Sequence, residues 1–584
     1  NMAETIISPG VFTRENDISF IQPAPTVAGA SIIGPTVKGP VEVPTLVTSY
    51  GEYVRKFGTT FASGSTSYEF LTSIAVKNYF QQGGNSVLVS RVVNGSFSRA
   101  TSSHVSASGR GSDQPFELET IGKGAIYNNS TSVLDAGEEH SDGSLVSGSA
   151  DSIRWQVSNI NEQLGTFTLG VRRGDDSTKN QVVLETFNNV SLDPNSDNYI
   201  ERAVGNQYKQ LNASENYVAT VGEYVNNSNY IRVSAVNTPT LNYLGTDGIT
   251  VGKDSSNVSY SGSLPIEESG SFFGATGDIV RTDEANAHFK DISATNTQGL
   301  EPADYSDIIG TLANTEEYVF NIISAPGLIH KITGHSTPLD RIISLAESRG
   351  DCIAVVDLVE HGQTVGATTT QGQTLNSSYA ASYWPWLQTV SATGRNEWIP
   401  ASVVIPGVYA FTDNSSAPWF APAGLVRGGI TGVIQAERRL TRTQRDTLYS
   451  KKINPIASFP GQGISVFGQK TLQTKSSALD RVNVRRLLIE LKKFIGDQAR
   501  TLVFEQNTIT TRNKFLSTVN PYLESVVQRQ GLYAYRVVMD DTNNTADVVD
   551  RNQLIGQIFI QPAKTAEFVV LDFTIEPSGA TFVG

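Results

Sequence analysis

The sequence predicts a multidomain protein of mixed α+β and α/β type, with inner α/β domains, a β-rich outer insertion and extended terminal β-arms. Three observations predict this fold class. The chain has 584 residues, more than one hydrophobic core usually organises. Only 17% of its residues are charged, against roughly 25% in typical soluble domains, and its 51 glycines favour turn-rich β structure. Finally, segments that alternate helix and strand enclose a long region of short strands.

The composition and pattern of the sequence change five times along the chain, which predicts five parts, one of them built from two separate stretches. We expect an N-terminal arm over residues 1–20, a middle domain formed by residues 21–94 together with 305–480, a β-rich insertion of one or two subdomains over residues 95–304, an inner C-terminal domain over residues 481–566 and a C-terminal arm over residues 567–584.

The first α/β unit follows the N-terminal arm. Apolar periodicity predicts a helix over residues 67–82, ended by Gly83 and Gly84, and then a buried strand over residues 86–93. In the insertion, "TFTLGVRR" (166–173) has the alternation of a strand. Residues 245–303 have the least apolar periodicity and predict a mobile surface excursion.

After the insertion, the sequence again has the apolar pattern of a packed core. It begins with the apolar segment "EEYVFNIISAPGL" (316–328), after which we expect a helix near "LDRIISLAESRG", ended by Gly350, and a strand over residues 352–359. After residue 430 the chain alternates helix and strand. The expected helices are "VIQAERRLTRTQRDTLYSKK" and "VNVRRLLIELKKFIGDQARTLVF", and the expected strands are "YAYRVVMDD" and "GQIFIQP".

Charge is distributed unevenly along the chain. The net charge is −13, yet the segment from Arg427 to Arg500 carries 15 Lys and Arg against 5 Asp and Glu, a local charge of +10. The rest of the chain therefore carries −23. This segment is suited to an acidic partner.

The last strand of the sequence, "AEFVVLDFTIEP" (566–577), raises a pairing problem. Val569, Leu571, Phe573 and Ile575 share one face, and only "SGATFVG" follows them. A long apolar strand with an open edge is a hazard that proteins normally cover. The sequence itself offers no later strand to cover it.

Catalytic and cofactor motifs are weak. "GISVFGQKT" (463–471) resembles a phosphate-binding loop, but Gln469 stands where the lysine belongs, so we expect a strand bounded by glycines. The six histidines have no metal-ligand spacing, Asp357 and His361 lack a nucleophile elbow, and Cys352 predicts a buried, inert thiol. We expect no enzyme activity, no cofactor and no metal.

The aromatic cluster in "SSYAASYWPWL" (377–387) leaves two interpretations open. Tyr383, Trp384 and Trp386 suit the packed seam between two domains, or an aromatic platform for carbohydrate. The first residues lack a secretory pattern, and no run reaches the ~18 apolar residues of a membrane span. We therefore expect no membrane insertion by this chain.

An ordered set of motifs resembles the tail sheath proteins of contractile-tailed, myovirus-type bacteriophages. The motifs are "SPGVF", "GPTVKGP", "QQGGNSVLVSRV", "GKGAIYNN", "ETFNNVSLDPNSDNYIERAV", "SSYAASYWPW", "IPASVVIPGVYAFTD", "APWFAPAG", "INPIASFPGQGISVFGQKTL", "VNVRRLLIELKKFI" and "VFEQNT". They cover most of the chain and are weakest over residues 205–305. Where many sheaths have Trp and Arg, this chain has Phe467 and Gln469.

The resemblance implies a structural subunit of a virion tail, assembled in the host cytoplasm. Such subunits form six-fold helical rings around a tail tube and contract from a metastable extended state, which drives the tube through the host envelope for genome delivery. The implied partners are further copies of the chain, the tube protein, and the baseplate and tail-terminator proteins, with no direct contact to nucleic acid.

The resemblance also answers the pairing problem. It implies that the C-terminal strand (Val569, Leu571, Phe573 and Ile575) adds to a sheet of an adjacent subunit, together with Ile6, Ile7, Val11 and Phe12 from the N-terminal arm of another. A further hypothesis places a basic helix face at the inner radius, against an acidic tube; its residues are Arg485, Arg486, Lys492 and Lys493.

Two other functions remain open at this point. The first is the sheath of a phage-derived contractile injection system or bacteriocin. The second is a β-rich adhesin that binds carbohydrate through the tryptophan cluster.

Overall fold

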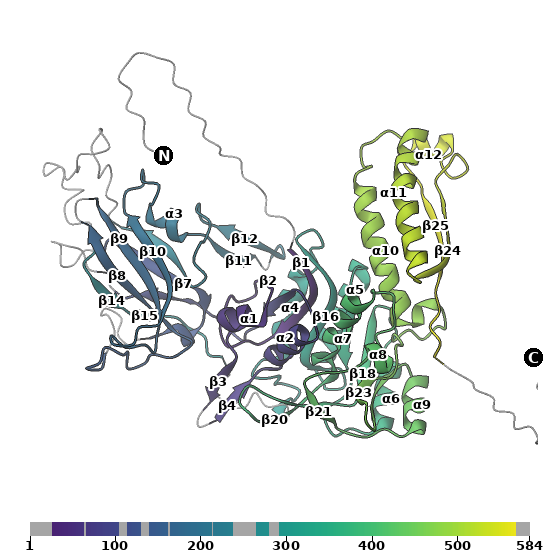
Figure 1. Ribbon diagram of the computed structural model, residues 1–584, viewed down its shortest axis with the longest axis horizontal. Coiled ribbons are helices and arrows are strands. Elements are labelled where there is room, and N and C mark those ends of the chain that lie inside the picture. Colours follow the sequence, from purple (N-terminus) through teal and green to yellow (C-terminus); the bar gives the residue numbers. More distant parts are fainter. Residues whose placement is uncertain are drawn as a thin grey trace, which may run out of the picture.

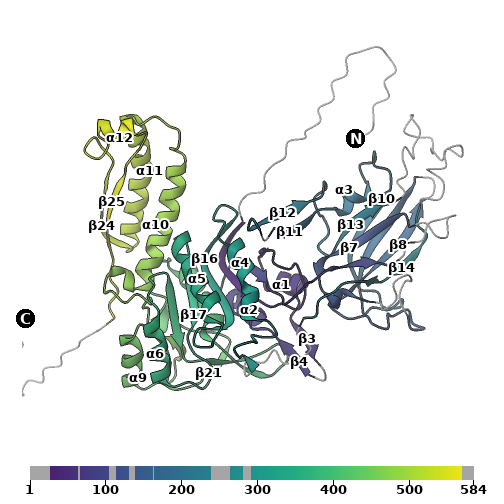
Figure 2. The same ribbon diagram turned by 180° about the vertical axis from the view of Figure 1, so that it is seen from behind.

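The computed structural model describes residues 26–63, 66–103, 105, 114–129, 139–161, 164–212, 214–237, 264–279 and 291–567. Three lobes follow one another along its longest axis (Figure 1), and the view from behind shows the same order (Figure 2). We name them the β-rich lobe (described residues of 95–279), the central lobe (26–94 and 291–481) and the helical lobe (482–562).

The central lobe is built on one eight-stranded sheet with strand order β2-β5-β1-β16-β17-β18-β22-β23. The six inner strands run parallel, and the two edge strands, β2 and β23, run antiparallel to their neighbours. The strands are β1 Thr26–Gly34, β2 Thr45–Val47, β5 Val87–Arg91, β16 Tyr318–Ile329, β17 Ile353–Asp357, β18 Ala380–Trp384, β22 Asn454–Phe459 and β23 Gly463–Val466.

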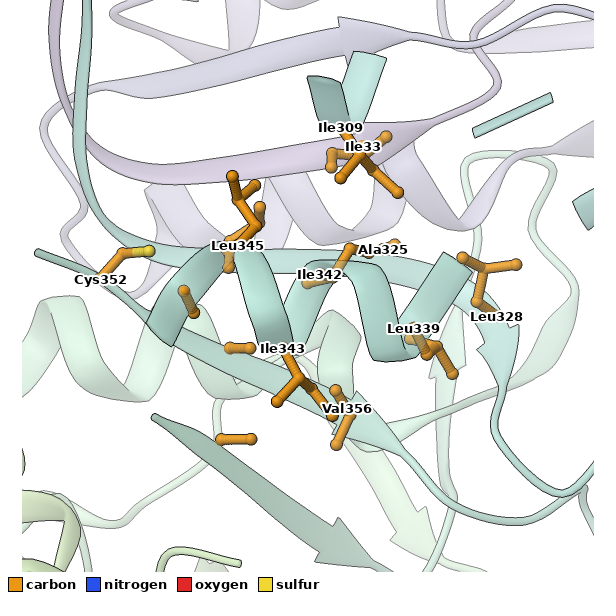
Figure 3. Packing of buried hydrophobic residues seen from close by; sticks show 14 of the residues in the cluster. Ile33, Ile309, Ala325, Leu328, Leu339, Ile342, Ile343, Leu345, Cys352 and Val356 are labelled. Carbon is orange, nitrogen blue, oxygen red and sulfur yellow. The ribbon is translucent and has the colours of Figure 1, made fainter. Parts of the chain in front are cut away.

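Helices cover both faces of this sheet, as a parallel sheet requires. Successive residues of β1 show it, because Ile32 and Ile33 are both fully buried but belong to clusters on opposite faces. Figure 3 shows the face that carries Ile33, with α5 packed above Cys352 and Val356. On this face lie α4 Ser306–Thr311, α5 Ser336–Arg349, α6 Val365–Thr374 and α9 Arg442–Ser450; on the other lie α1 Tyr50–Phe57, α2 Leu71–Gln81, α7 Ile405–Ser415 and α8 Gly424–Arg427.

The β-rich lobe is inserted between two strands of the large sheet, since the chain leaves after β5 and returns for β16. Two four-stranded antiparallel sheets share one hydrophobic cluster, which contains Trp155, Phe116 and Phe167. The sheets are β10-β9-β8-β14 and β13-β7-β6-β15, with a separate hairpin β11-β12. The bounds are β6 Arg99–Ser102, β7 Phe116–Lys123, β8 Ile153–Asn161, β9 Thr166–Arg173, β10 Val183–Ser191, α3 Ile200–Val204, β11 Tyr208–Asn212, β12 Tyr217–Val221, β13 Ile231–Val236, β14 Glu268–Gly270 and β15 Phe272–Phe273.

The helical lobe packs two long helices against a two-stranded sheet (Figure 1). Two smaller sheets, β3-β4 and β20-β19-β21, complete the central lobe. The remaining bounds are β3 Thr60–Ser63, β4 Thr66–Glu69, β19 Leu387–Val390, β20 Asn396–Ile399, β21 Val433–Ala436, α10 Val482–Arg500, α11 Ile509–Gln528, β24 Leu532–Val538, α12 Ala546–Asp550 and β25 Gln557–Pro562.

Three predicted elements need correction. The first predicted helix begins only at Leu71, because Thr66–Glu69 pairs with β3 as a strand. The segment expected as a helix from residue 433 begins as strand β21, and only Arg442–Ser450 is helical. Within the predicted excursion, Gln298 is fully buried, and its side-chain oxygen Oε1 accepts a hydrogen bond from the backbone amide of Leu71 at 2.8 Å. Residues 238–263 and 280–290 lie outside the described residues.

Asp357, at the end of β17, makes the stability of the central lobe depend on pH. Its carboxylate is 4% exposed and accepts hydrogen bonds from the amide and the hydroxyl of Ser402. Burial raises the pKa of Asp357 from 3.8 to about 7. Between these two values the folded state keeps a proton that the unfolded state has released, so stability falls as the pH rises from about 4 to about 7.

We expect Asp357→Asn to flatten this profile. The lost slope approaches about 1.4 kcal/mol per pH unit in that window, because one proton is involved. Urea denaturation of both proteins at several pH values between 4 and 8 measures it. Parallel profiles for the two proteins would show that Asp357 is ionised in the folded state.

Candidate functional site

An incomplete small sheet stands out in the helical lobe. β24 and β25 pair antiparallel with each other and pack beside α11 (Figures 1 and 2). Among the described residues, neither strand has a partner on its outer edge. Two-stranded sheets are only marginally stable alone, and unpaired edges invite further strands. This sheet is therefore suited to accept strands.

Side chains on the face of this sheet that is turned to the helices support that interpretation. Tyr535, Val537, Ile558 and Ile560 pack against the core of the helical lobe but are only partly buried. Their burial is incomplete because the sheet is only two strands wide. Apolar side chains of a strand added at either edge would lie next to them.

The segment that follows β25 is attached to the central lobe by polar contacts. The amide of Gln469 donates to the hydroxyl of Thr565 at 2.5 Å and to Glu567 at 3.2 Å. The guanidinium of Arg481 binds both carboxylate oxygens of Glu567, at 2.7 and 3.1 Å. Gln469 is thus buried against the root of the C-terminal arm.

The predicted arm residues themselves lie outside the described residues. They are Ile6, Ile7, Val11, Phe12, Val569, Leu571, Phe573 and Ile575. Their role in joining subunits stays a prediction.

The predicted basic face is wrong for two of its four residues. Arg485 and Arg486 are each only 4% exposed. The guanidinium of Arg485 stacks 3.9 Å from the ring centre of Tyr379, and that of Arg486 lies 4.7 Å from the ring centre of Tyr409. The first half of α10 is buried on nearly all sides, because it packs between two hydrophobic clusters: Val482 and Ile489 belong to the one on the large sheet, and Leu487 and Leu491 belong to the core of the helical lobe.

Lys492 and Lys493 remain candidates for contact with a partner. Lys492 is exposed, with its ammonium 3.2 Å from the hydroxyl of Tyr379, and Lys493 is partly exposed. Both lie in the second half of α10, beyond the buried turns.

Arg486 instead joins the helical lobe to the central lobe. One of its guanidinium nitrogens lies 2.5 and 2.6 Å from the carboxylate oxygens of Asp413, at the end of α7. We expect Arg486→Gln to lower the free energy of unfolding by about 2–3 kcal/mol, because it leaves a largely buried carboxylate without its cation. Urea denaturation followed by far-UV circular dichroism measures it. The matched control is Lys492→Gln, on the exposed part of the same helix, and an equal loss in both variants would contradict the prediction.

The aromatic cluster is part of the core. Tyr383, Trp384 and Trp386 are 3%, 2% and 2% exposed. The hydroxyl of Tyr383 lies 2.6 Å from that of Tyr409, and the indole of Trp386 donates to the carbonyl of Val359 at 2.9 Å. The interpretation of this cluster as a carbohydrate-binding platform is therefore wrong, because none of the three rings has a face free to stack on a sugar. The role of these residues as a domain seam stays a prediction.

The weak chemical motifs have structural roles. Residues 463–466 form edge strand β23, as expected for a strand bounded by glycines. Cys352 is fully buried, and burial raises the pKa of its thiol. No helix of the described part is long and apolar enough to cross a membrane.

Sequence reasoning missed α11 and the contacts of Glu567. The sequence does carry a signal for α11, because Thr508 caps its first turn and Phe515, Val519, Leu523 and Val526 recur at helical spacing. No local signal reveals the contacts of Glu567, since its partners lie 86 and 98 residues away.

Two adjacent family profiles match the second half of the chain. The phage tail sheath protein central domain matches residues 299–472, and the phage tail sheath C-terminal domain matches residues 474–576. The first covers most of the large sheet, and the second covers the helical lobe with the small sheet.

Curated relatives carry the same name. The tail sheath protein of Vibrio phage KVP40 is 44% identical over 188 residues, which are 32% of this chain and 28% of that protein. The tail sheath protein of Enterobacteria phage T4 is 35% identical over 269 residues, which are 42% of this chain and 40% of that protein. The chain thus spans less than half the length of either relative.

A solved structure shares the fold over a larger part of the chain. The sheath tail protein of Listeria innocua aligns with a TM-score of 0.52 at 12% identity, over 92% of this chain and 96% of its own. At that identity the likeness shows the fold alone. Its two matched domains and its phage relatives identify the chain as a member of the phage tail sheath family.

Proposed function

We propose that this chain is the structural subunit of a contractile phage tail sheath, polymerised as six-fold helical rings around the tail tube. The observation that carries the proposal is the two-stranded sheet β24-β25, whose outer edges are unpaired among the described residues of a sheath-family domain. A sheet with two free edges can accept one strand on each side. The sequence offers two candidate donors, residues 5–14 and 568–576.

Strand addition between subunits joins them strongly. Each donated strand makes main-chain hydrogen bonds, worth about 0.5–1.5 kcal/mol net each, and its alternate apolar side chains cover the partly buried face of the small sheet. Arg481 and Gln469 hold the root of the C-terminal arm at Glu567, so the arm leaves each subunit from a fixed point on the central lobe.

Such joints are compatible with contraction. Rigid lobes can rotate and slide while covalently continuous arms keep neighbours connected, provided that the motion takes place in the segments that flank the arms. We propose that the subunits start in a metastable extended lattice and that contraction buries more surface between them. This movement drives the tube through the host envelope and requires no nucleotide.

Lys492 and Lys493 are the candidate contacts to an acidic tube. Exposed ion pairs are worth only about 0–1 kcal/mol each, which suits a contact that is released during contraction. We propose that baseplate and tail-terminator proteins meet the two ends of the lattice, within a virion tail assembled in the host cytoplasm.

Electron microscopy of the purified chain tests the proposed assembly. We expect long tubes or stacked rings from the full chain and only small particles from a chain that ends at Glu567, which keeps all contacts at the root of the arm. Dispersed particles of about one subunit from both chains would contradict the proposal. Tubes of equal length from both would show that the C-terminal arm is not the joint.

A further inference from the structure

A cavity of about 860 Å³ lies where the β-rich lobe meets the central lobe. One wall comes from the segment after β1 and from α1, and the other from β6, β7 and the hairpin β11-β12. An ion pair bridges the two sides, with the ammonium of Lys38 3.0 Å from the carboxylate of Asp151. The volume lies within the range of small-molecule sites, about 300–1,000 Å³.

The lining of this cavity is strongly basic. It contains seven Lys and Arg side chains, and Asp151 is its only carboxylate. Three of the cations have an acidic partner; the pairs are Lys38 with Asp151, Lys56 with Glu52, and Arg173 with Asp175. Within the described ranges, the other four, Arg55, Arg99, Lys123 and Lys209, form no ion pair closer than 4 Å.

Arg99 is an example of a cavity cation whose charge is not neutralised by an ion pair among the described residues. Its Nε is buried without a hydrogen-bond partner, and its terminal nitrogen reaches the carbonyl of Lys209 only at 3.3 Å. Its guanidinium lies 4.6 Å from the ring centre of Tyr208, against which Arg232 also packs, at 4.4 Å. Among the described residues, the guanidinium of Arg99 is therefore held by one long hydrogen bond and a ring contact, with no carboxylate in an ion pair with it.

Repulsion between neighbouring cations of the cavity also favours the binding of an anion. Burial lowers the pKa of Arg99, and the neighbouring charge of Arg232 lowers it further. Burial likewise lowers the pKa of Lys123, with a second contribution from the charge of Arg99. The carboxylates of Glu119 and Glu42 offset only part of this repulsion. A multivalent anion in the cavity would relieve it.

We propose that this cavity binds a compact oligophosphate, with Arg99 and Lys123 as its inner contacts and Arg55 and Lys209 at the exposed mouth. Guanidinium and ammonium groups are the usual protein donors to phosphate oxygens. Because the two walls belong to different lobes, a bound oligophosphate would also tie the β-rich lobe to the central lobe.

Isothermal titration of the full chain with inorganic tripolyphosphate tests the proposal. We expect one site per chain, with an affinity that falls as salt is raised. The double variant Arg99→Gln with Lys123→Gln should weaken binding by about tenfold or more, since two charge-assisted contacts are lost. The matched control is Lys451→Gln with Lys475→Gln, two exposed lysines outside the cavity, which should leave the affinity unchanged.

Further titrations distinguish a simple oligophosphate from a nucleotide and from an acidic peptide as the ligand. Titration with ATP reports whether the apolar part of the wall holds a base: tighter binding than tripolyphosphate assigns a nucleotide, and equal or weaker binding assigns the phosphate chain alone. Thermal unfolding without ligand checks that both double variants fold. No saturable binding of tripolyphosphate, an equal loss in the control, or binding only of an acidic peptide such as oligoglutamate would overturn the proposal. Tube formation is scored separately, so it can succeed or fail independently of binding.

Discussion

The substitution Phe573→Asp is expected to abolish the formation of long tubes, whereas Thr574→Asp is expected to leave it intact. The two variants add the same charge at neighbouring positions of the predicted C-terminal strand. They place it on opposite faces of the strand, because Phe573 alternates with Thr574, and only the first variant also removes an apolar side chain.

The expected difference follows from the energetics of strand addition. If the apolar face of the arm covers the partly buried side of the small sheet, Phe573 contributes about 1.5–3 kcal/mol by its burial. An aspartate in that place loses this contribution and also requires a charge to be desolvated. The loss is repeated at every joint of the lattice, so assembly responds far more steeply than one contact would.

Negative-stain electron microscopy and sedimentation at matched protein concentration measure the outcome. Circular dichroism of both variants provides the control, since neither substitution touches a described contact. Equal tube formation by the two variants would show that the arm does not bind through its apolar face, and loss in both would indicate that any added charge at this end blocks assembly.

Elements with strong local patterns could be predicted from the sequence. The alternation of "TFTLGVRR" predicts a strand over the residues that β9 occupies. The apolar run after Gly84 and the glycine at 350 likewise mark a strand and a helix end that the structure contains. In each case the hydrophobic period or a turn residue alone determines the element.

The candidate sites were less predictable, because their partners are distant in sequence. A helical pattern places Arg486 on the face of the helix opposite the apolar stripe, and this predicts a solvated guanidinium. The structure buries it against Tyr409 and Asp413, 77 and 73 residues earlier in the chain. A guanidinium over an aromatic ring can be buried at low cost, and a periodicity argument cannot anticipate that.

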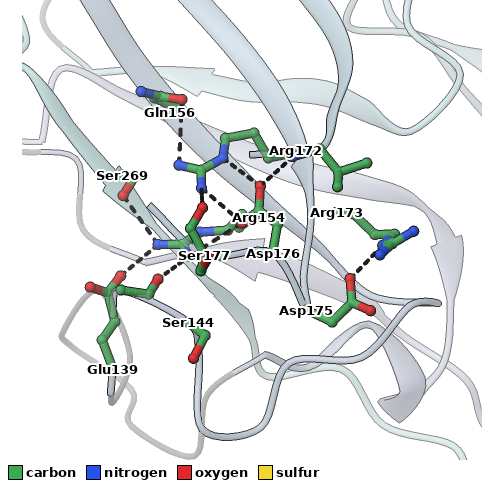
Figure 4. Close-up of polar contacts among 12 residues, drawn as sticks. Glu139, Ser144, Arg154, Gln156, Arg172, Arg173, Asp175, Asp176, Ser177 and Ser269 are labelled. Carbon is green, nitrogen blue, oxygen red and sulfur yellow. Dashed lines mark hydrogen bonds and ion pairs between the residues drawn. The ribbon is translucent and has the colours of Figure 1, made fainter. Parts of the chain in front are cut away.

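The substitution Asp176→Asn is expected to destabilise the β-rich lobe by about 3–5 kcal/mol. Asp176 is 2% exposed and lies between two buried arginines (Figure 4). Its carboxylate oxygens accept from Arg172 at 2.7 and 2.8 Å, and Arg154 lies 3.5 Å away. Without this carboxylate, the guanidinium of Arg172 keeps only the carbonyl of Ser177, at 3.3 Å, and a long contact to Gln156, at 3.5 Å.

The neighbouring residue provides the matched control. Asp175 pairs with Arg173, but these side chains are 33% and 40% exposed. Water solvates both of them when the pair is broken, so Asp175→Asn should cost no more than about 1 kcal/mol. The pair of variants thus compares the loss of a buried and an exposed carboxylate one residue apart.

Hydrogen exchange followed by mass spectrometry measures the effect where it arises. With Asp176→Asn we expect faster exchange in peptides from β8 and β9 and unchanged exchange in β16 and β17, because the β-rich lobe has a hydrophobic core of its own. Equal exchange in the two aspartate variants would show that Arg154 and Arg172 find other partners. Faster exchange throughout the chain would show that the β-rich and central lobes unfold as one cooperative unit. In that case, a change in the stability of one lobe would also change the stability of the other.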